Sequence, residues 1–348
     1  MATRPARSLT LAASTARSKR VSTGSHRTTV TPEMTNQRLT RSAAFACALG
    51  TALSACAAYG IVADSMVMDA GFRVDGTMNG IPVRMCVDTG SPTALLPIAT
   101  ARRCGLELFA TQMEVTDGTG ATLPAAGEVD YALQLGSTTF HSRAICLHAP
   151  ASLGDGLIGF DLVRACAWLF DAPRGVVHMA PAGDAEQVLR DCGYRVIDVL
   201  TLGHDEWRPT ITVRLDGRVE ATLLLDTGAE STSLPAPVVD ALQLPCGNEL
   251  ARQRSDEQAA AIEAELRRHG VEARVSVPPD EGTFVGVHGV IEQSSLHHLR
   301  RLKLGSRTFE DLVVARSERG GVLGRDVLGE CTWLLHGPRR ELWLLEQQ

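Results

Sequence analysis

The chain has 348 residues, of which 44% are hydrophobic and 21% are charged, and its formal net charge is −6. This composition is that of a globular protein, and the length suits about two domains of ordinary size. The acidic balance gives no sign of nucleic-acid binding, so we expect no nucleic-acid partner.

The first 56 residues predict a disordered leader and a signal peptide. Residues 1–32 contain several arginines and no acid, and an apolar stretch follows at 43–53. This layout is typical of a secretory signal, with Met34 favoured over Met1 as the start. The segment Leu53-Ser54-Ala55-Cys56 resembles the bacterial lipobox, which implies cleavage before Cys56 and a lipid anchor on that residue.

Other interpretations of this leader stay open. Its start also resembles an organellar transit peptide, and residues 43–53 are a candidate for an uncleaved anchor, although a span needs about 20 apolar residues. By the lipobox resemblance, Ala57 implies attachment to the membrane through Cys56 on the periplasmic face of the outer membrane. A soluble periplasmic protein, or one anchored in the inner membrane, is the alternative.

The first half begins with a hairpin and an acidic motif. Strands are predicted at 72–74 and 83–87 around Asn79-Gly80, a two-residue turn signal. The second strand runs into Asp88-Thr89-Gly90, and a helical turn is predicted at 98–104. An aspartate at the end of a buried strand is costly to bury ionised without a partner, so we expect Asp88 to have one.

A stretch that suits a mobile hairpin follows, with Asp117-Gly118-Thr119-Gly120 at its tip. Because glycines favour a tip that must bend, Gly118 and Gly120 are candidate tip residues. The corresponding stretch of the second half offers Gly286 and Gly289. An ordinary surface hairpin is the alternative for each.

The second half repeats this order. Strands at 211–215 and 221–225 flank Asp216-Gly217 and run into Asp226-Thr227-Gly228, before a helical turn at 237–242. Three further segments match between the halves: Leu135-Gly136-Ser137 with Leu304-Gly305-Ser306, Gly156-Leu157-Ile158-Gly159 with Gly321-Val322-Leu323-Gly324, and Cys166-Ala167-Trp168-Leu169 with Cys331-Thr332-Trp333-Leu334. The chain therefore contains a duplicated domain, and its two matched aspartates suggest one shared site.

These motifs, found twice and in order, resemble the pepsin and retropepsin clan of aspartic proteases over about residues 67 to 348. The closest likeness is to bacterial retropepsin-like members with both halves in one polypeptide. The resemblance implies an all-β bilobal fold of two duplicated β-barrel-like lobes with short helices, and a hairpin flap over the cleft between them. The lobes are expected at 67–182 and 194–348, with linkers at 57–66 and 183–193.

The two halves differ in length and chemistry. The second carries an insertion at about 247–274, where Gln253–Arg268 has a helical pattern; a solvated excursion is favoured over a lid or partner surface. His336 stands where the first half has Asp171, and Ala229 stands where it has Ser91. We therefore do not expect the lobes to be chemically equivalent.

The resemblance makes Asp88 and Asp226 the catalytic pair. It also implies supporting roles in the active-site loops, where the threonines lock the loops together and the glycines admit the substrate backbone: Thr89, Gly90, Thr227 and Gly228. Two carboxylates held close together share one proton, so one can activate a water while the other polarises a peptide carbonyl. The expected function is that of an aspartic endopeptidase acting on peptides or proteins, active as a monomer because both acids come from one chain.

The main alternative is a catalytically silent, retropepsin-like envelope lipoprotein that binds a peptide or partner. A serine hydrolase is disfavoured because no Gly-x-Ser-x-Gly segment occurs, and the pair His297-His298 is expected at the surface. No Cys-x-x-Cys or His-x-x-x-His spacing occurs, so we expect no metal and no cofactor. Of the nine cysteines, those beyond Cys47 and Cys56 are odd in number, so at least one thiol stays unpaired or pairs between chains.

Overall fold

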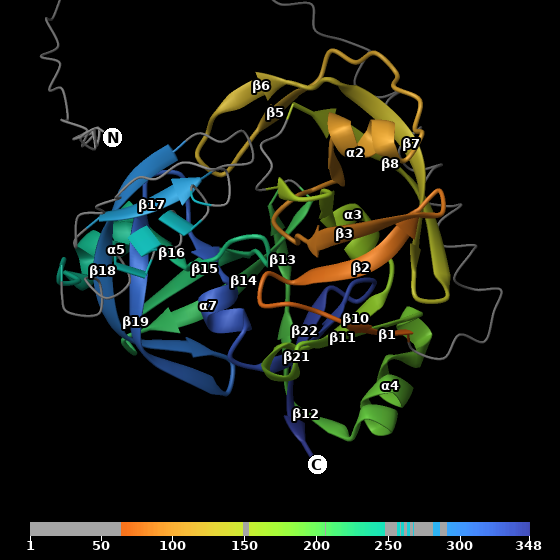
Figure 1. Ribbon diagram of the computed structural model, residues 1–348. Helices are drawn as coiled ribbons and strands as arrows, with labels where there is room; N and C mark the ends of the chain where they lie inside the picture. The colour runs from red at the N-terminus through yellow and green to blue at the C-terminus, as the bar shows by residue number, and fades with distance from the viewer. Residues whose placement is uncertain are drawn as a thin grey trace, which may run out of the picture.

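The structure is a computed structural model that describes residues 64–148, 153–205, 207–247, 256–257, 259–260, 263–264, 267, 281–285 and 291–348. It is mainly β, with two ring-closed mixed sheets that form two lobes, short helices, and a six-stranded sheet between the lobes (Figure 1). The matched halves of the sequence build these two lobes.

The first lobe is a closed barrel. Its strands, in order around the ring, are β2 (Arg73–Met78), β3 (Ile81–Val87), β9 (Leu157–Ile158), β4 (Leu95–Pro97), β8 (Thr138–Leu147) and β7 (Gly127–Leu135). The ring closes where Thr77 and Met78 pair with Gln134 and Leu133. Helices α2 (Ile98–Arg103) and α3 (Phe160–Val163) follow β4 and β9, and the hairpin of β5 (Glu114–Thr116) and β6 (Thr122–Pro124) forms a separate two-stranded sheet.

The second lobe repeats the ring. Its strands are β14 (Arg208–Leu215), β15 (Val219–Leu225), β20 (Val322–Leu323), β16 (Ser233–Pro235), β19 (Arg307–Ser317) and β18 (Ile291–Leu304), with β13 (Gly203–Asp205) and β17 (Glu281–Val285) at the ends. Pairing of β14 with β18 closes this ring. Helix α5 (Ala236–Leu242) follows β16, and α7 (Arg325–Leu328) follows β20.

The six-stranded sheet joins the lobes. Its order is β1 (Asp64–Val67), β11 (Val176–Ala180), β10 (Ala167–Asp171), β21 (Thr332–His336), β22 (Glu341–Gln347) and β12 (Tyr194–Thr201). In the central pair Leu169 lies opposite Leu334, so matched residues of the two halves meet in the middle. Phe170 stacks on Trp333 with ring centroids 4.1 Å apart, which continues the core from one lobe into the other.

The predicted hairpins and helical turns are present. Met78 pairs with Ile81, and Asn79 and Gly80 adopt φ values of 49° and 76°, as a two-residue hairpin turn requires. The turn between β14 and β15 is one residue longer, with Asp216 and Gly217 at positive φ. Helices α2 and α5 lie within one residue of the predicted turns.

Regular structure occurs within both ranges expected as linkers. Strand β1 begins at Asp64, whose carboxylate accepts hydrogen bonds from the N–H and Oγ of Ser137 and from Oγ1 of Thr138. The segment 183–193 contains the last residues of a 3-10 turn (Ala182–Asp184) and α4 (Ala185–Cys192); a first 3-10 turn (Ala172–Arg174) follows β10. Val188 and Leu189 of α4 pack on the interlobe sheet because they lie on its apolar face.

Several expectations concern residues that the structure does not describe. The leader with Cys56, and the tip residues Gly286 and Gly289, lie outside the described residues. Of the expected insertion, residues 256–257, 259–260, 263–264 and 267 are described and helical. Within the described ranges no helix is long and apolar enough to cross a membrane.

Candidate active site

Asp88 and Asp226 lie at equivalent places, at the ends of β3 and β15. The Asp88 N–H donates to the carbonyl of Ile158 at 2.9 Å, and the Asp226 N–H donates to that of Leu323 at 3.1 Å. These carbonyls belong to β9 and β20, which run parallel to β3 and β15. The apolar pairs Leu157-Ile158 and Val322-Leu323 therefore hold the two strands that end in the aspartates.

Thr89 and Thr227 bind the two loops to each other. Thr89 Oγ1 donates to the carbonyl of Leu225 at 2.6 Å, and Thr227 Oγ1 donates to that of Val87 at 2.5 Å. Each hydroxyl also accepts the backbone N–H of the other threonine, at 3.0 and 3.1 Å. Both side chains are fully buried, so these four reciprocal bonds fix one lobe against the other at the site.

Each carboxyl group is held by its own loop. Oδ1 of Asp88 accepts the N–H groups of Gly90 and Ser91 at 2.9 and 3.0 Å. Oδ1 of Asp226 accepts those of Gly228 and Ala229 at 2.8 and 3.1 Å. Because only backbone N–H groups are used, the replacement of Ser91 by Ala229 in the second half leaves this contact unchanged.

The two glycines make room for the opposite carboxyl group. A Cβ placed on Gly90 lies 2.3 Å from Cγ of Asp226, and one placed on Gly228 lies 2.5 Å from Cγ of Asp88. Any side chain at these positions would push the carboxyl groups apart. The sequence expectation, close approach of a substrate backbone, stays a prediction; the contact seen is with the partner carboxyl group.

The proximity of the two acids changes their titration. Burial raises the pKa of Asp88 well above its ordinary value, and the charge of Asp226 and the hydrogen bond between the two side chains raise it further. Burial also raises the pKa of Asp226, while the hydrogen bond from Asp88 and the two backbone N–H groups oppose that rise. The two half-buried carboxyl groups are therefore expected to titrate as a coupled pair.

A second aspartate in each half, not singled out from the sequence, supports the site loops. Asp161 accepts the Thr93 hydroxyl at 3.1 Å, and Asp326 accepts the N–H and hydroxyl of Thr232 at 2.9 and 2.6 Å. Burial raises the pKa of Asp161 to about 6. The sequence feature that could have indicated them is their matched position, since each aspartate lies two residues after a matched glycine, Gly159 or Gly324.

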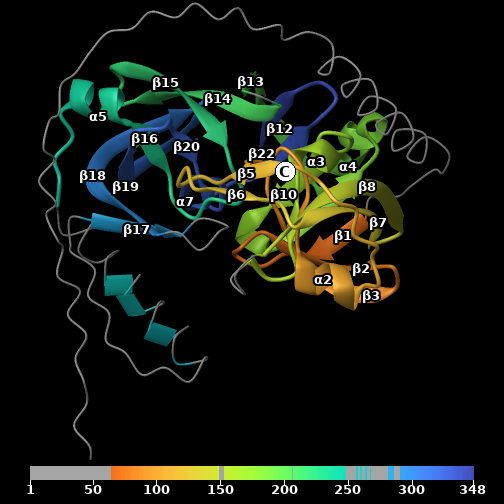
Figure 2. The same cartoon turned by 90° about the horizontal axis from the view of Figure 1, so that it is seen from above.

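The tip predicted at 117–120 connects β5 and β6. Asp117 Oδ1 accepts the N–H and Oγ1 of Thr119, at 3.0 and 2.6 Å, and Gly120 has a φ of 77°. Seen from above, the hairpin extends from the first lobe towards the second (Figure 2). A Cβ on Gly118 meets nothing within 4 Å, so packing does not require a glycine at that position.

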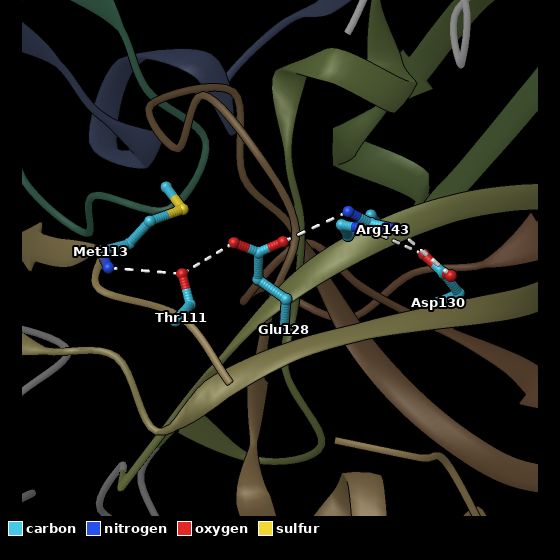
Figure 3. Close-up of polar contacts among 5 residues, drawn as sticks. All are labelled: Thr111, Met113, Glu128, Asp130 and Arg143. Carbon is cyan, nitrogen blue, oxygen red and sulfur yellow. Dashed lines mark hydrogen bonds and ion pairs between the residues drawn. The ribbon is translucent and has the colours of Figure 1, made fainter. Parts of the chain in front are cut away.

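Polar contacts fix the base of this hairpin. Thr111 Oγ1 donates to Glu128 at 2.8 Å and accepts the N–H of Met113 at 3.3 Å, while Arg143 bridges Glu128 and Asp130 (Figure 3). The network ties the segment that enters the hairpin to the barrel strands β7 and β8.

One expectation about the histidines is wrong. His297 is buried, with Nδ1 3.1 Å from the Leu244 carbonyl and Nε2 2.9 Å from Ser295 Oγ. These two partners satisfy the ring inside the second lobe, whereas His298 lies 3.1 Å from the exposed Asp311. In the described part of the chain, no group of three or more His, Cys, Asp or Glu side chains is arranged to hold a metal ion, and no disulfide joins the described cysteines.

Replacing Thr227 with alanine should destabilise the protein by about 2–4 kcal/mol, because the Val87 carbonyl and the Thr89 N–H lose their buried partner. Chemical denaturation of the full-length protein measures this change. Thr227→Ser keeps the hydroxyl and serves as the control, with a smaller loss. Equal stability of wild type and Thr227→Ala would show that the reciprocal bonds do not hold the lobes.

Comparison with known proteins adds one family match. Residues 74–162 match the family model described as "Aspartyl protease", a range that contains Asp88-Thr89-Gly90 and Leu157-Ile158-Gly159. No curated protein is matched by the sequence. The chain thus contains an aspartyl protease domain over residues 74–162.

Proposed function

We propose that the protein is an aspartic endopeptidase of the pepsin and retropepsin type, with Asp88 and Asp226 as its catalytic pair. The observation that carries the proposal is the reciprocal bonding of Thr89 and Thr227, since it brings the aspartate outside the matched segment into contact with the one inside it. The raised pKa values of both acids support it, because a shared proton is what the chemistry needs.

In the proposed reaction, the ionised member of the pair takes a proton from a bound water as the water oxygen attacks the peptide carbonyl carbon. The protonated member donates a hydrogen bond to the carbonyl oxygen and stabilises the negative charge that develops there. Collapse of the tetrahedral intermediate breaks the C–N bond, and the leaving amine receives the proton that the first carboxylate took from the water. Water is the nucleophile, so no bond forms between enzyme and substrate.

The proposed architecture is the bilobal fold of this clan, with lobes at about 67–182 and 194–348 and a solvated helical insertion near 247–274. Support comes from two rings of matching strand order and from the central pairing of Leu169 with Leu334. Both acids come from one chain, so the proposal needs only a monomer. A peptide or protein segment in extended conformation is the proposed substrate.

We also propose that the protein is an exported lipoprotein anchored through Cys56, with the sequence around that residue as support. Changing Cys56→Ser should move the protein from the membrane fraction to the soluble fraction of a bacterial host, because the lipid is lost. The control is Cys47→Ser, which alters the signal but not the anchor. A Cys56→Ser variant that stays in the membrane would contradict lipidation at this residue.

The variants Asp88→Asn and Asp226→Asn should each lose peptide cleavage by a factor of at least about a thousand, since neither can share a proton with its partner. Folding should persist because asparagine Oδ1 can still accept the two backbone N–H groups of its loop. Digestion of a peptide library, followed by mass spectrometry, measures the loss. A folded wild type that cuts no peptide at any pH would instead favour the binding protein without catalysis.

The pH dependence of stability follows from the raised pKa values. The raised pKa values contribute to the free energy of unfolding below pH 3.8, the ordinary value for an aspartate. This contribution is lost as the pH rises through the folded-state pKa, because the folded pair must then release a proton that it binds more tightly than the unfolded chain does. The variant Asp88→Asn should therefore be more stable than wild type at neutral pH. This difference in stability should become smaller as the pH is lowered. Thermal unfolding across pH measures this gap. Asp75→Asn, at a side chain 72% exposed, is the control and should show no such trend.

A further inference from the structure

The hairpin of β5 and β6, residues 114–124, here called the flap, lies closed against the first lobe. At its base, Phe109 and Glu128 exchange two backbone hydrogen bonds of 2.8 Å. Its inner face carries Val115, which packs with Ala125 on a separate apolar cluster of Cys86, Leu95, Ile145, Leu147, Leu153 and Leu157. The flap therefore packs on a cluster that includes Cys86 of β3, the strand that leads into Asp88.

The flap tip contacts the second lobe. Thr119 is only 7% exposed although it lies at the end of a hairpin. A Cβ placed on the next residue, Gly120, lies 2.5 Å from both Cζ and Nε of Arg319. The Arg319 guanidinium group therefore lies directly against the backbone of the flap tip, and it reaches there from the opposite lobe.

Arg319 belongs to the loop that leads into the strand supporting Asp226. Two residues later, the Gly321 carbonyl accepts the N–H of Leu224 at 2.9 Å, and β20 then supports Asp226 through Leu323. Gly321 is tightly packed, since a Cβ there lies 2.3 Å from Leu223 and 2.7 Å from Pro235. Gly320, between the packed residue and Arg319, has a φ of 135°, which only glycine adopts readily.

We propose that Arg319 is a positioning residue that catches the flap at Gly120 and holds it closed across the cleft, so that a peptide enters only when this contact opens. The contact joins the flap of one lobe to the loop that supports the aspartate of the other. Its meaning for catalysis rests on the proposed endopeptidase function, whereas the contact itself can be tested without any cleavage assay.

The first test is amide hydrogen exchange in the flap of the full-length protein without substrate. Arg319→Ala should speed exchange across residues 113–125 by about fivefold or more, because the closed state loses its contact with the second lobe. Arg316→Ala is the matched control: it removes the same charge from the same segment, but its guanidinium pairs with Asp240 and Glu318 of the second lobe. Flap exchange that is equal in Arg319→Ala and wild type would overturn the proposal.

The second test asks whether the two residues act through each other. Gly120→Ala should speed flap exchange as well, since its methyl group takes the place of the guanidinium. The double variant Gly120→Ala/Arg319→Ala should then exchange no faster than the faster single variant, because both remove one contact. If the two increases in exchange rate multiply in the double variant, the residues act independently, and the proposed contact between Arg319 and Gly120 does not hold the flap.

Kinetics separates this proposal from the proposed function. With a peptide that wild type cleaves, Arg319→Ala should lower KM several-fold, because the open flap that admits the peptide becomes more populated, and should leave kcat within about twofold, because the catalytic pair is untouched. A large fall in kcat with KM unchanged would contradict a positioning role. If the wild type cleaves nothing while the exchange results hold, the catch stands and the endopeptidase function fails.

Discussion

The reciprocal hydrogen bonds of Thr89 and Thr227 are the interaction on which the site depends. Each hydroxyl donates to a carbonyl of the opposite lobe and accepts an N–H from it, so neither loop satisfies its backbone alone. Once these bonds form, Gly90 and Gly228 leave space for the carboxyl groups and for little else. The raised pKa values follow from this enforced proximity, because two half-buried carboxylates in contact cannot both stay ionised easily.

The interlobe sheet is nearly symmetric, but the loops around the site are not. Leu169 meets Leu334 at the centre of the interlobe sheet, as expected for a duplicated domain. By the same matching of the halves, however, the position of Arg319 corresponds to Gly154 in the first lobe, which has no side chain to hold a flap. At this matched position, the second half therefore places a cation against the flap tip, and the first half has none.

Local patterns were sufficient to predict the hairpin at Asn79-Gly80, the helical turns and both acidic motifs, because each depends on residues close in sequence. What failed depends on distant partners. Strand β1 forms because Asp64 pairs opposite Met179, and His297 is buried because the Leu244 carbonyl faces it. The contact of Gly120 with Arg319 likewise joins the two lobes, and no local sequence pattern predicts it.

The most direct test of the account is a carbon-13 NMR titration of the aspartate carboxyl groups in the full-length protein, compared with Asp88→Asn and Asp226→Asn. The account predicts two carboxyl resonances that titrate in coupled steps, with a step above the ordinary value of 3.8, and a single step left in either variant. Two independent titrations, each near the ordinary value and each unchanged when the other aspartate is replaced, would contradict a carboxyl pair that shares one proton.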